Sequence, residues 1–158
     1  MVTFDASQPT LSVVETTRRH KVCPVLQIIL ADDNPRVRAA VQLLFEQTGL
    51  ARIVAEAETF DELQALFADA ELTFDAILLD WELPGMVQYD GTVSDAFLKF
   101  LKERYDAHII VWSSHPGAAQ AALQTGADAF VSKGEPVDSL EHILRMLAND
   151  TNAHEESA

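Results

Sequence analysis

Short apolar runs alternate with amphipathic segments between residues 25 and 148. The runs are rich in Ile, Val and Leu, and each is too short for a typical helix. Continuous apolar runs of this length are typical of strands that are buried on both faces of a parallel sheet. The five predicted strands are LQIIL (26–30), ARIVA (51–55), FDAILL (74–79), HIIVW (108–112) and DAFV (128–131).

Each run is followed by a segment whose apolar residues recur at helical spacing. Asn34 and Pro35 are suited to begin the first helix, because Asn caps helix starts and Pro fits the first turn. Gly49 can end that helix, because Gly readily adopts the left-handed conformation of a helix C-cap. The predicted helices lie around Val37–Phe45, Phe60–Phe67, Ala96–Tyr105, Pro116–Thr125 and Val137–Leu147.

The regular alternation of strand and helix predicts the fold class. Parallel strands need crossover connections, and these crossovers are right-handed in nearly all proteins. We therefore predict an α/β protein: a (βα)5 doubly wound parallel sheet of five strands with helices on both faces. If the strand order is 2-1-3-4-5, strands one and four both flank strand three.

The two ends of the chain lack this alternation. We interpret residues 1–24 as an N-terminal extension and residues 149–158 as an acidic, polar C-terminal tail. Residues 25–148 then form one domain, of a size at which a single hydrophobic core is usual.

The charge balance excludes some classes of function. Eleven Lys and Arg face twenty-five Asp and Glu, so the net charge is −14. Binding to nucleic acid phosphates needs a basic surplus, so we expect no nucleic-acid partner. The N-terminus lacks a secretory apolar region and no run is long enough to span a bilayer, so we expect no membrane association. The single Cys23 fits a reducing compartment, and a cytoplasmic location is expected.

Polar and charged side chains gather where the predicted strands end. In open α/β sheets, ligands bind outside the carboxyl ends of the strands. Neighbouring strands lie about 4.8 Å apart, so side chains at these ends are expected to share one site. The candidates are Asp32 and Asp33 after the first strand, Asp80 after the third, Ser113 and Ser114 after the fourth, and Lys133 after the fifth.

Three carboxylates this close together need a compensating positive charge. Two carboxylates about 5 Å apart repel by roughly 3 kcal/mol at an effective dielectric constant of about 20. Lys133 supplies one positive charge, and a divalent cation supplies two. Oxygen ligands without a nearby His or Cys suit Mg²⁺ or Mn²⁺ better than zinc. We therefore expect Mg²⁺ or Mn²⁺ as the cofactor.

Four motifs in this order resemble those of the receiver domain of two-component response regulators. They are the acidic pair in ILADDNP, the aspartate in ILLDWELPG, the hydroxyl in IIVWSS and the lysine that ends GADAFVSK. The resemblance covers roughly Val25 to Ala148. It implies a flavodoxin-like fold and a stand-alone receiver that signals in a phosphorelay.

The resemblance implies a role for each acidic residue. Asp80 is expected to be the phosphoacceptor, a carboxylate that attacks the phosphohistidine of a histidine kinase or phosphotransfer protein. Asp33, Asp80 and the backbone carbonyl of Glu82 would bind Mg²⁺ directly, and Asp32 would act through a metal-bound water. The chain would be no enzyme beyond Mg²⁺-dependent phosphotransfer to its own aspartate.

The resemblance also implies how the phosphoryl group is held and sensed. Ser113, Ser114 and Lys133 would bind its oxygens, and Ser113 and Phe130 would form a switch. Phe130 would turn inward when Ser113 moves toward the phosphoryl group. The output would then be contact with a protein partner on the face made by the fourth helix, fifth strand and fifth helix.

Other interpretations stay open at this stage. The Asp32-Asp33 pair also suits a helix start, and Asp80 also suits a turn before Pro84. The chain can instead be a receiver-fold binding module that works without phosphorylation. A phosphatase resembling the haloacid dehalogenases is a third option, although its nucleophile lies on the first strand. The three residues 87–89, inserted after the xPxM segment, lengthen the loop beside the expected metal site.

Overall fold

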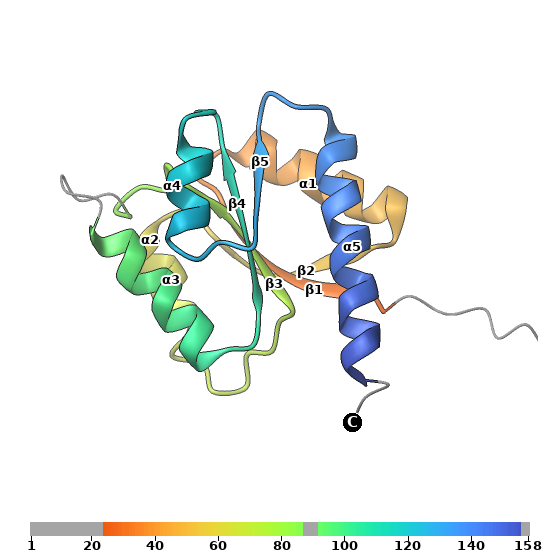
Figure 1. The fold of residues 1–158 in the computed structure, drawn as a ribbon, viewed down its shortest axis with the longest axis horizontal. Coiled ribbons are helices and arrows are strands. Elements are labelled where there is room, and N and C mark those ends of the chain that lie inside the picture. Colours follow the sequence, from red (N-terminus) through yellow and green to blue (C-terminus); the bar gives the residue numbers. More distant parts are fainter. Residues whose placement is uncertain (1–23, 87–91, 156–158) are drawn as a thin grey trace, which may run out of the picture.

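The computed structural model describes residues 24–86 and 92–155, which contain a parallel sheet of five strands. The strand order is β2-β1-β3-β4-β5, which confirms the order expected for a flavodoxin-like fold (Figure 1). All four pairs of neighbouring strands are parallel, so the carboxyl ends of the strands meet at one edge. The strands are β1 (Leu26–Ala31), β2 (Ala51–Ala57), β3 (Ala76–Asp80), β4 (His108–Ser113) and β5 (Ala129–Ser132).

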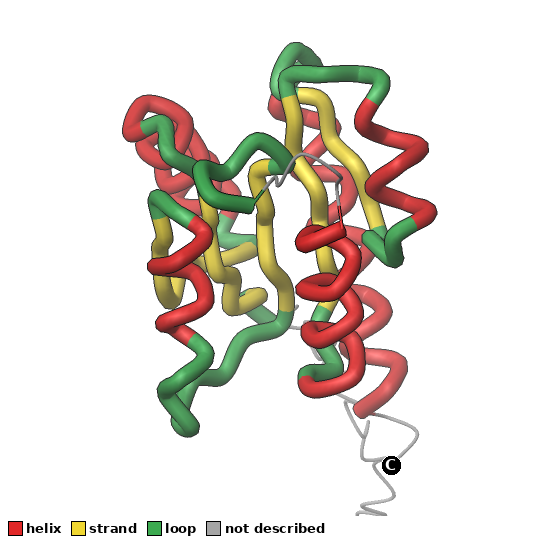
Figure 2. The backbone as a smooth tube through the Cα atoms, turned by 90° about the vertical axis from the view of Figure 1, so that its left-hand side faces the viewer, coloured by secondary structure: helices red, strands yellow, loops and turns green. Residues whose placement is uncertain are grey.

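The helices cover both faces of this sheet, which confirms the predicted doubly wound α/β fold. Helices α1 and α5 lie on one face, and α2, α3 and α4 lie on the other (Figures 1 and 2). The helices are α1 (Pro35–Thr48), α2 (Phe60–Leu66), α3 (Thr92–Arg104), α4 (Ala118–Gln124) and α5 (Val137–Glu155).

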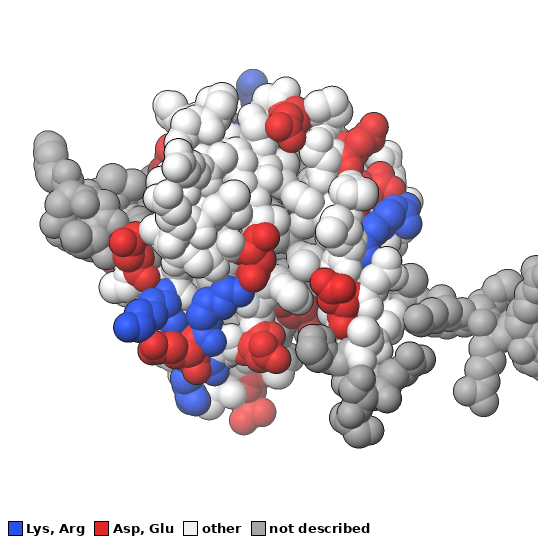
Figure 3. Space-filling model, viewed as in Figure 1, with Lys and Arg blue, Asp and Glu red and all other residues white. Residues whose placement is uncertain are grey.

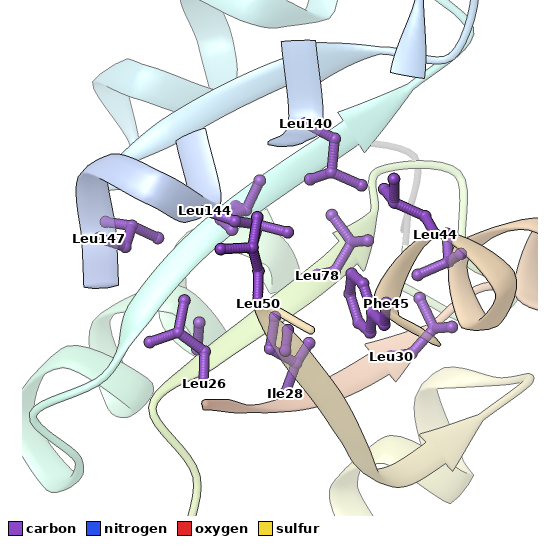
Figure 4. Packing of buried hydrophobic residues seen from close by; sticks show 14 of the residues in the cluster. Leu26, Ile28, Leu30, Leu44, Phe45, Leu50, Leu78, Leu140, Leu144 and Leu147 are labelled. Atoms are coloured by element: carbon purple, nitrogen blue, oxygen red, sulfur yellow. The ribbon is translucent and has the colours of Figure 1, made fainter. Parts of the chain in front are cut away.

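Strand β1 shows how the sequence builds two cores. Successive side chains of a strand point to opposite faces, so Leu26, Ile28 and Leu30 pack toward α1 and α5. Ile29 and Ala31 pack toward the layer of α2, α3 and α4. All five side chains are fully buried. Figure 4 shows the first core, where Leu and Phe side chains from α1, α5 and the sheet meet.

The link from β1 to α1 is short, and the cap of α1 holds its last residue, Asn34. The Asn34 side chain accepts a hydrogen bond from the backbone N–H of Arg36 at 3.0 Å, and Pro35 is the first helical residue. Gly49 ends the helix with φ of 64°, as its sequence context predicts. Asp32 and Asp33 therefore occupy the two positions between the end of β1 and the helix cap.

The observed elements differ from the predicted ranges mainly at the end of the last helix. Helix α5 runs to Glu155, so most of the segment predicted as a polar tail (149–158) is helical. The apolar stripe stops near Leu147, but backbone hydrogen bonding carries a helix past the last core contact. The hydroxyl of Thr151 bonds the carbonyl of Leu147 at 3.0 Å within this extension.

Two predictions fall on residues outside the described part of the chain. These are the N-terminal extension, apart from Pro24, and the inserted residues 87–89. Among the helices of the described residues, none combines the length and the hydropathy needed to cross a membrane.

Candidate functional site

Three carboxylates converge at the carboxyl ends of β1 and β3. Asp32 and Asp33 follow β1, and Asp80 is the last residue of β3, its neighbour in the sheet. One carboxylate oxygen from each lies within 4.8 Å of the other two. Asp32 and Asp80 are 0 % and 2 % exposed, whereas Asp33 is exposed. The predicted acidic cluster is therefore assembled with two buried members and one that faces solvent.

Lys133 places its ammonium group between the two buried carboxylates. Its Nζ atom lies 2.8 Å from Asp32 Oδ2 and 3.0 Å from Asp80 Oδ2. The backbone N–H of Lys133 donates to the carbonyl of Ser113 at 2.8 Å, which extends the β4–β5 pairing by one residue. Burial lowers the pKa of Lys133, but the hydrogen bonds and charges of the two carboxylates outweigh it and raise that pKa. Lys133 is therefore protonated at neutral pH and carries a positive charge at this site.

The Asp80 carboxyl group has an unusual proton affinity. Burial raises the pKa of Asp80 to about 6, although hydrogen bonds from the Glu82 backbone N–H and from Lys133 lower it. The Glu82 N–H donates to Asp80 Oδ1 at 2.9 Å. The negative charge on Asp80 is thus poorly compensated by the protein alone, which favours a further cation near this carboxylate.

The Glu82 side chain also takes part in the site, whereas only its backbone carbonyl was expected there. Its Oε1 accepts the hydroxyl of Ser113 at 2.5 Å and contacts Nδ1 of His115 at 2.5 Å. Burial opposes the charged form, but hydrogen bonds from Ser113 and His115 lower the pKa of Glu82 to about 2. Glu82 and His115 each lie two residues beyond the end of neighbouring strands, so the spacing places their backbones close together but does not predict the contact of their side chains.

Trp112 is a second site residue that the sequence analysis missed. Its indole Nε1–H donates to Asp32 Oδ2 at 3.1 Å, and Asp32 Oδ1 accepts the backbone N–H of Asn34 at 2.8 Å. Strand β3 separates β4 from β1, so the contact spans two strand spacings, about 10 Å. Only a long side chain bridges that gap, and periodicity in the sequence gives no sign of it.

Arg38 of α1 holds the backbone of the acidic loop. Its Nη1 donates to the carbonyl oxygen of Asp32 at 2.8 Å, and its guanidinium also pairs with Glu56 and Glu58 at the end of β2. The loop that carries Asp33 is therefore tied to two neighbouring elements.

The remaining predicted residues differ in burial and in whether they line the pocket beside the cluster. Ser113 is fully buried, whereas Ser114 is exposed and lines a pocket that also contains Asp33 and Asp80. Phe130 is half-buried and packs with the layer of α2, α3 and α4, away from the pocket lining. The pocket itself is lined by Asp33, Asn34, Val37, Asp80, Glu82, Ser114, His115 and Lys133.

The donor set fits a hard divalent cation. The three clustered carboxylates offer oxygen atoms only, and Lys133 compensates one of their negative charges. Oxygen donors with residual negative charge are what Mg²⁺ and Mn²⁺ prefer. A cation bound near Asp33 and Asp80 would be open to solvent and to a second ligand, because Asp33 lines the open pocket.

Comparisons with known proteins give matches over most of the described domain. The profile of the response regulator receiver domain matches residues 28–145. A putative transcriptional regulator from Pseudomonas aeruginosa is 37% identical over 116 residues, which cover 72% of this chain and 52% of that protein. A protein-glutamate methylesterase/protein-glutamine glutaminase from Cereibacter sphaeroides is 30% identical over 127 residues, covering 77% and 32%.

A solved structure gives the same result for the fold. A chain in the crystal structure of the P1 domain of CheA3 in complex with CheY6 from R. sphaeroides aligns with a TM-score of 0.63 and 26% identity, covering 77% of this chain and 95% of that one. The aligned part spans from a third to about half the length of the two curated relatives.

Proposed function

The chain belongs to the response regulator receiver family, and from this premise we propose that it is a phosphoacceptor in a two-component phosphorelay. Asp80 would accept a phosphoryl group from the phosphohistidine of a histidine kinase or phosphotransfer protein, in the cytoplasm. The observation that carries this proposal is Lys133 Nζ, held 2.8 Å from Asp32 and 3.0 Å from Asp80 beside a third carboxylate. With a divalent cation bound beside Lys133, such a cluster would supply the positive charge that the oxygens of a phosphoryl group need.

Asp80 is suited to be the nucleophile. With a pKa of about 6, its carboxylate is mostly charged at neutral pH, yet it is only 2 % exposed and lightly hydrated. In the transfer, an Asp80 oxygen forms the new P–O bond as the P–N bond to histidine breaks, and the imidazole nitrogen keeps that electron pair. Lys133 would then neutralise charge on the phosphoryl oxygens.

The acidic residues would share the metal among them. We assign Asp33, Asp80 and the backbone carbonyl of Glu82 to direct contact with Mg²⁺ or Mn²⁺, and Asp32 to contact through water. This division is supported by two observations. Asp33 is exposed, whereas both carboxylate oxygens of Asp32 already accept hydrogen bonds from protein groups. When bound, the cation supplies positive charge that screens the phosphoryl oxygens from the carboxylates.

Phosphorylation would change the partner of Ser113. The Ser113 hydroxyl now donates to Glu82, and a phosphoryl oxygen on Asp80 would compete for the same proton. Ser114, at the rim of the pocket, would provide a second contact to the phosphoryl group. A shift of Ser113 would in turn favour an inward position of Phe130. The Phe130 side chain is half-buried, and the residue lies two positions before the end of β5.

We propose that a protein partner reads this change on the face of α4, β5 and α5. Helix α4 (AAQAALQ) carries no charged residue in a chain of net charge −14, and Leu123 on it is 49 % exposed. Figure 3 shows the uncharged surface over α4 beside the charged side chains of α3. Exposed apolar surface of this kind is typical of protein contacts.

The alternative is a binding module that keeps the receiver fold without being phosphorylated. One observation favours this alternative: the Ser113 hydroxyl already donates a hydrogen bond to Glu82 in the unmodified protein. The haloacid dehalogenase alternative is not retained, because the receiver profile spans most of the domain and Asp80 ends the third strand.

Intact-mass analysis distinguishes the two functions. Incubated with a small-molecule acyl phosphate and Mg²⁺, the protein is expected to gain the mass of one phosphoryl group. Without a divalent cation, the gain is expected to be lost, because the carboxylates then repel the incoming phosphate.

The control is the same substitution at an aspartate outside the cluster, on the surface of α2. Asp80→Asn is expected to abolish the gain in mass, whereas Asp61→Asn, at an exposed position of α2, is expected to leave it unchanged. Equal labelling of the Asp80→Asn protein would contradict the assignment of Asp80. A wild-type protein that gains no mass under these conditions would favour the binding module.

A further inference from the structure

Trp112 and Lys133 bind the same oxygen of Asp32. The indole Nε1 lies 3.1 Å and the ammonium Nζ lies 2.8 Å from Asp32 Oδ2. Lys133 is also 3.0 Å from Asp80, and its Nζ lies 5.9 Å from the centre of the Trp112 ring. One carboxylate oxygen therefore has a charged donor that is shared with Asp80 and a neutral donor that is not.

The two donors differ in how freely they can move. Trp112 is next to last in β4, and its ring packs among the side chains of the α1–α5 core. Its backbone is held as well, because the carbonyl accepts the N–H of Trp81 at 3.0 Å. Lys133 lies just beyond the end of β5 on a flexible side chain with four methylene groups. Only the lysine can turn without disturbing the core.

This difference matters once Asp80 carries a phosphoryl group. Lys133 would then move from Asp32 toward the phosphoryl oxygens. Asp32 is fully buried, and a buried carboxylate oxygen that loses its donor is destabilised. The indole N–H stays on Oδ2 and limits that loss.

We propose that Trp112 is a positioning residue that holds Asp32 in place and so releases Lys133 to the phosphoryl group. The inference rests on the proposed phosphorylation of Asp80 and adds a residue that acts through Asp32. The aromatic ring alone would fill the same space, so the role belongs to the N–H group.

Two matched substitutions separate the N–H from the ring. Trp112→Phe keeps an aromatic side chain and removes the donor. Trp81→Phe makes the same change at the other indole, which is also half-buried but has no hydrogen bond to the described acidic cluster. With a small phosphodonor and saturating Mg²⁺, Trp112→Phe is expected to slow labelling about tenfold, and Trp81→Phe by less than twofold. Equal rates for wild type and Trp112→Phe would overturn the inference.

A double-mutant cycle tests the link to Lys133. In a Lys133→Ala background no donor has to leave Asp32, so Trp112→Phe is expected to change the slow residual rate by less than twofold. A purely structural role for the indole predicts the same tenfold loss in both backgrounds, and that result would overturn the proposal. Failure of the wild type to label would remove the proposed function, and this inference with it.

A measurement on the wild-type protein tests the hydrogen bond itself, without the Trp112→Phe substitution. The Trp112 indole N–H resonance, assigned by its presence in Trp81→Phe, should shift downfield and stay protected from exchange when the protein is phosphorylated. An indole proton that loses its protection on phosphorylation would show that Trp112 releases Asp32 together with Lys133, contrary to the proposal.

Discussion

Asp33 and Asn34 divide two tasks at the start of α1. Asn34 caps the helix, and its side chain accepts the N–H of Arg36 at 3.0 Å. Asp33 is exposed, with a carboxylate oxygen within 4.8 Å of those of Asp32 and Asp80. The helix cap is therefore Asn34, as the sequence predicts, and the carboxylate of Asp33 remains available to a metal ion.

This division predicts opposite effects for two neighbouring substitutions. Mg²⁺ should stabilise the wild type by RT ln(1 + [Mg²⁺]/Kd), about 2.7 kcal/mol at a hundredfold excess over Kd. Asp33→Ala should lose most of that gain and should melt no lower than wild type in EDTA, because it removes a repelling charge. Asn34→Ala should be about 1 kcal/mol less stable in EDTA and should keep the gain. Thermal melts in EDTA and in Mg²⁺ measure these effects. An Asp33→Ala protein whose melting temperature rises with Mg²⁺ as much as that of the wild type would contradict the metal role of Asp33.

The raised pKa of Asp80 predicts a pH dependence of stability. The folded protein binds the Asp80 proton more tightly than the unfolded chain, whose carboxyl has the ordinary pKa of 3.8. In metal-free buffer the free energy of unfolding should therefore fall as the pH rises from 3.8 to about 6. Glu82, whose pKa is lowered to about 2, contributes the opposite slope only below its ordinary value of 4.5.

Asp80→Asn isolates this contribution. Between about pH 4.5 and pH 6.5, denaturant unfolding should show the wild type losing on the order of 2 kcal/mol relative to Asp80→Asn. Parallel pH profiles of the two proteins would show that burial does not penalise the Asp80 charge.

Among the elements, α5 offers the clearest test of the packing. Leu144 is 0 % exposed in the core with α1, whereas Met146 is 54 % exposed on the same helix. Leu144→Ala should lower the free energy of unfolding by about 2–5 kcal/mol. Met146→Ala should change it by no more than about 0.5 kcal/mol. Similar losses for both, measured by denaturant unfolding, would contradict the packing of α5.

The elements also show which features the sequence predicts. Apolar periodicity predicted all five strands, because each run must be buried from both sides in a parallel sheet. The strand order, which the structure confirms, belonged to the flavodoxin-like fold that the resemblance implies. The periodicity missed the last two turns of α5, because those turns continue by backbone hydrogen bonding after the apolar stripe ends at Leu147.

The same limit applies to the site. Asp32, Asp80 and Lys133 could be predicted because strand ends meet at one edge of a parallel sheet. The roles of Trp112 and of the Glu82 side chain could not, because their partners lie on other strands and depend on side-chain reach. Sequence patterns locate backbones, whereas these contacts depend on rotamers.

At the scale of the whole molecule, charge distinguishes the region that we propose to bind a metal ion from the surface that we propose to bind a partner protein. The chain has a net charge of −14, and its three clustered acids lie at the carboxyl edge of the sheet. Helix α4, with no charged residue, lies beside this edge and follows β4, which carries Ser113. A change at the acidic pocket can thus reach an apolar surface within one connection.

The most direct test of this account is to locate the phosphoryl group. After phosphorylation with Mg²⁺, borohydride reduction converts an aspartyl phosphate to homoserine, and peptide mass analysis then identifies the modified position. The account predicts homoserine at position 80 alone. Homoserine at position 32 or 33, or labelling spread over several acidic residues, would contradict the assignment of Asp80 as the phosphoacceptor.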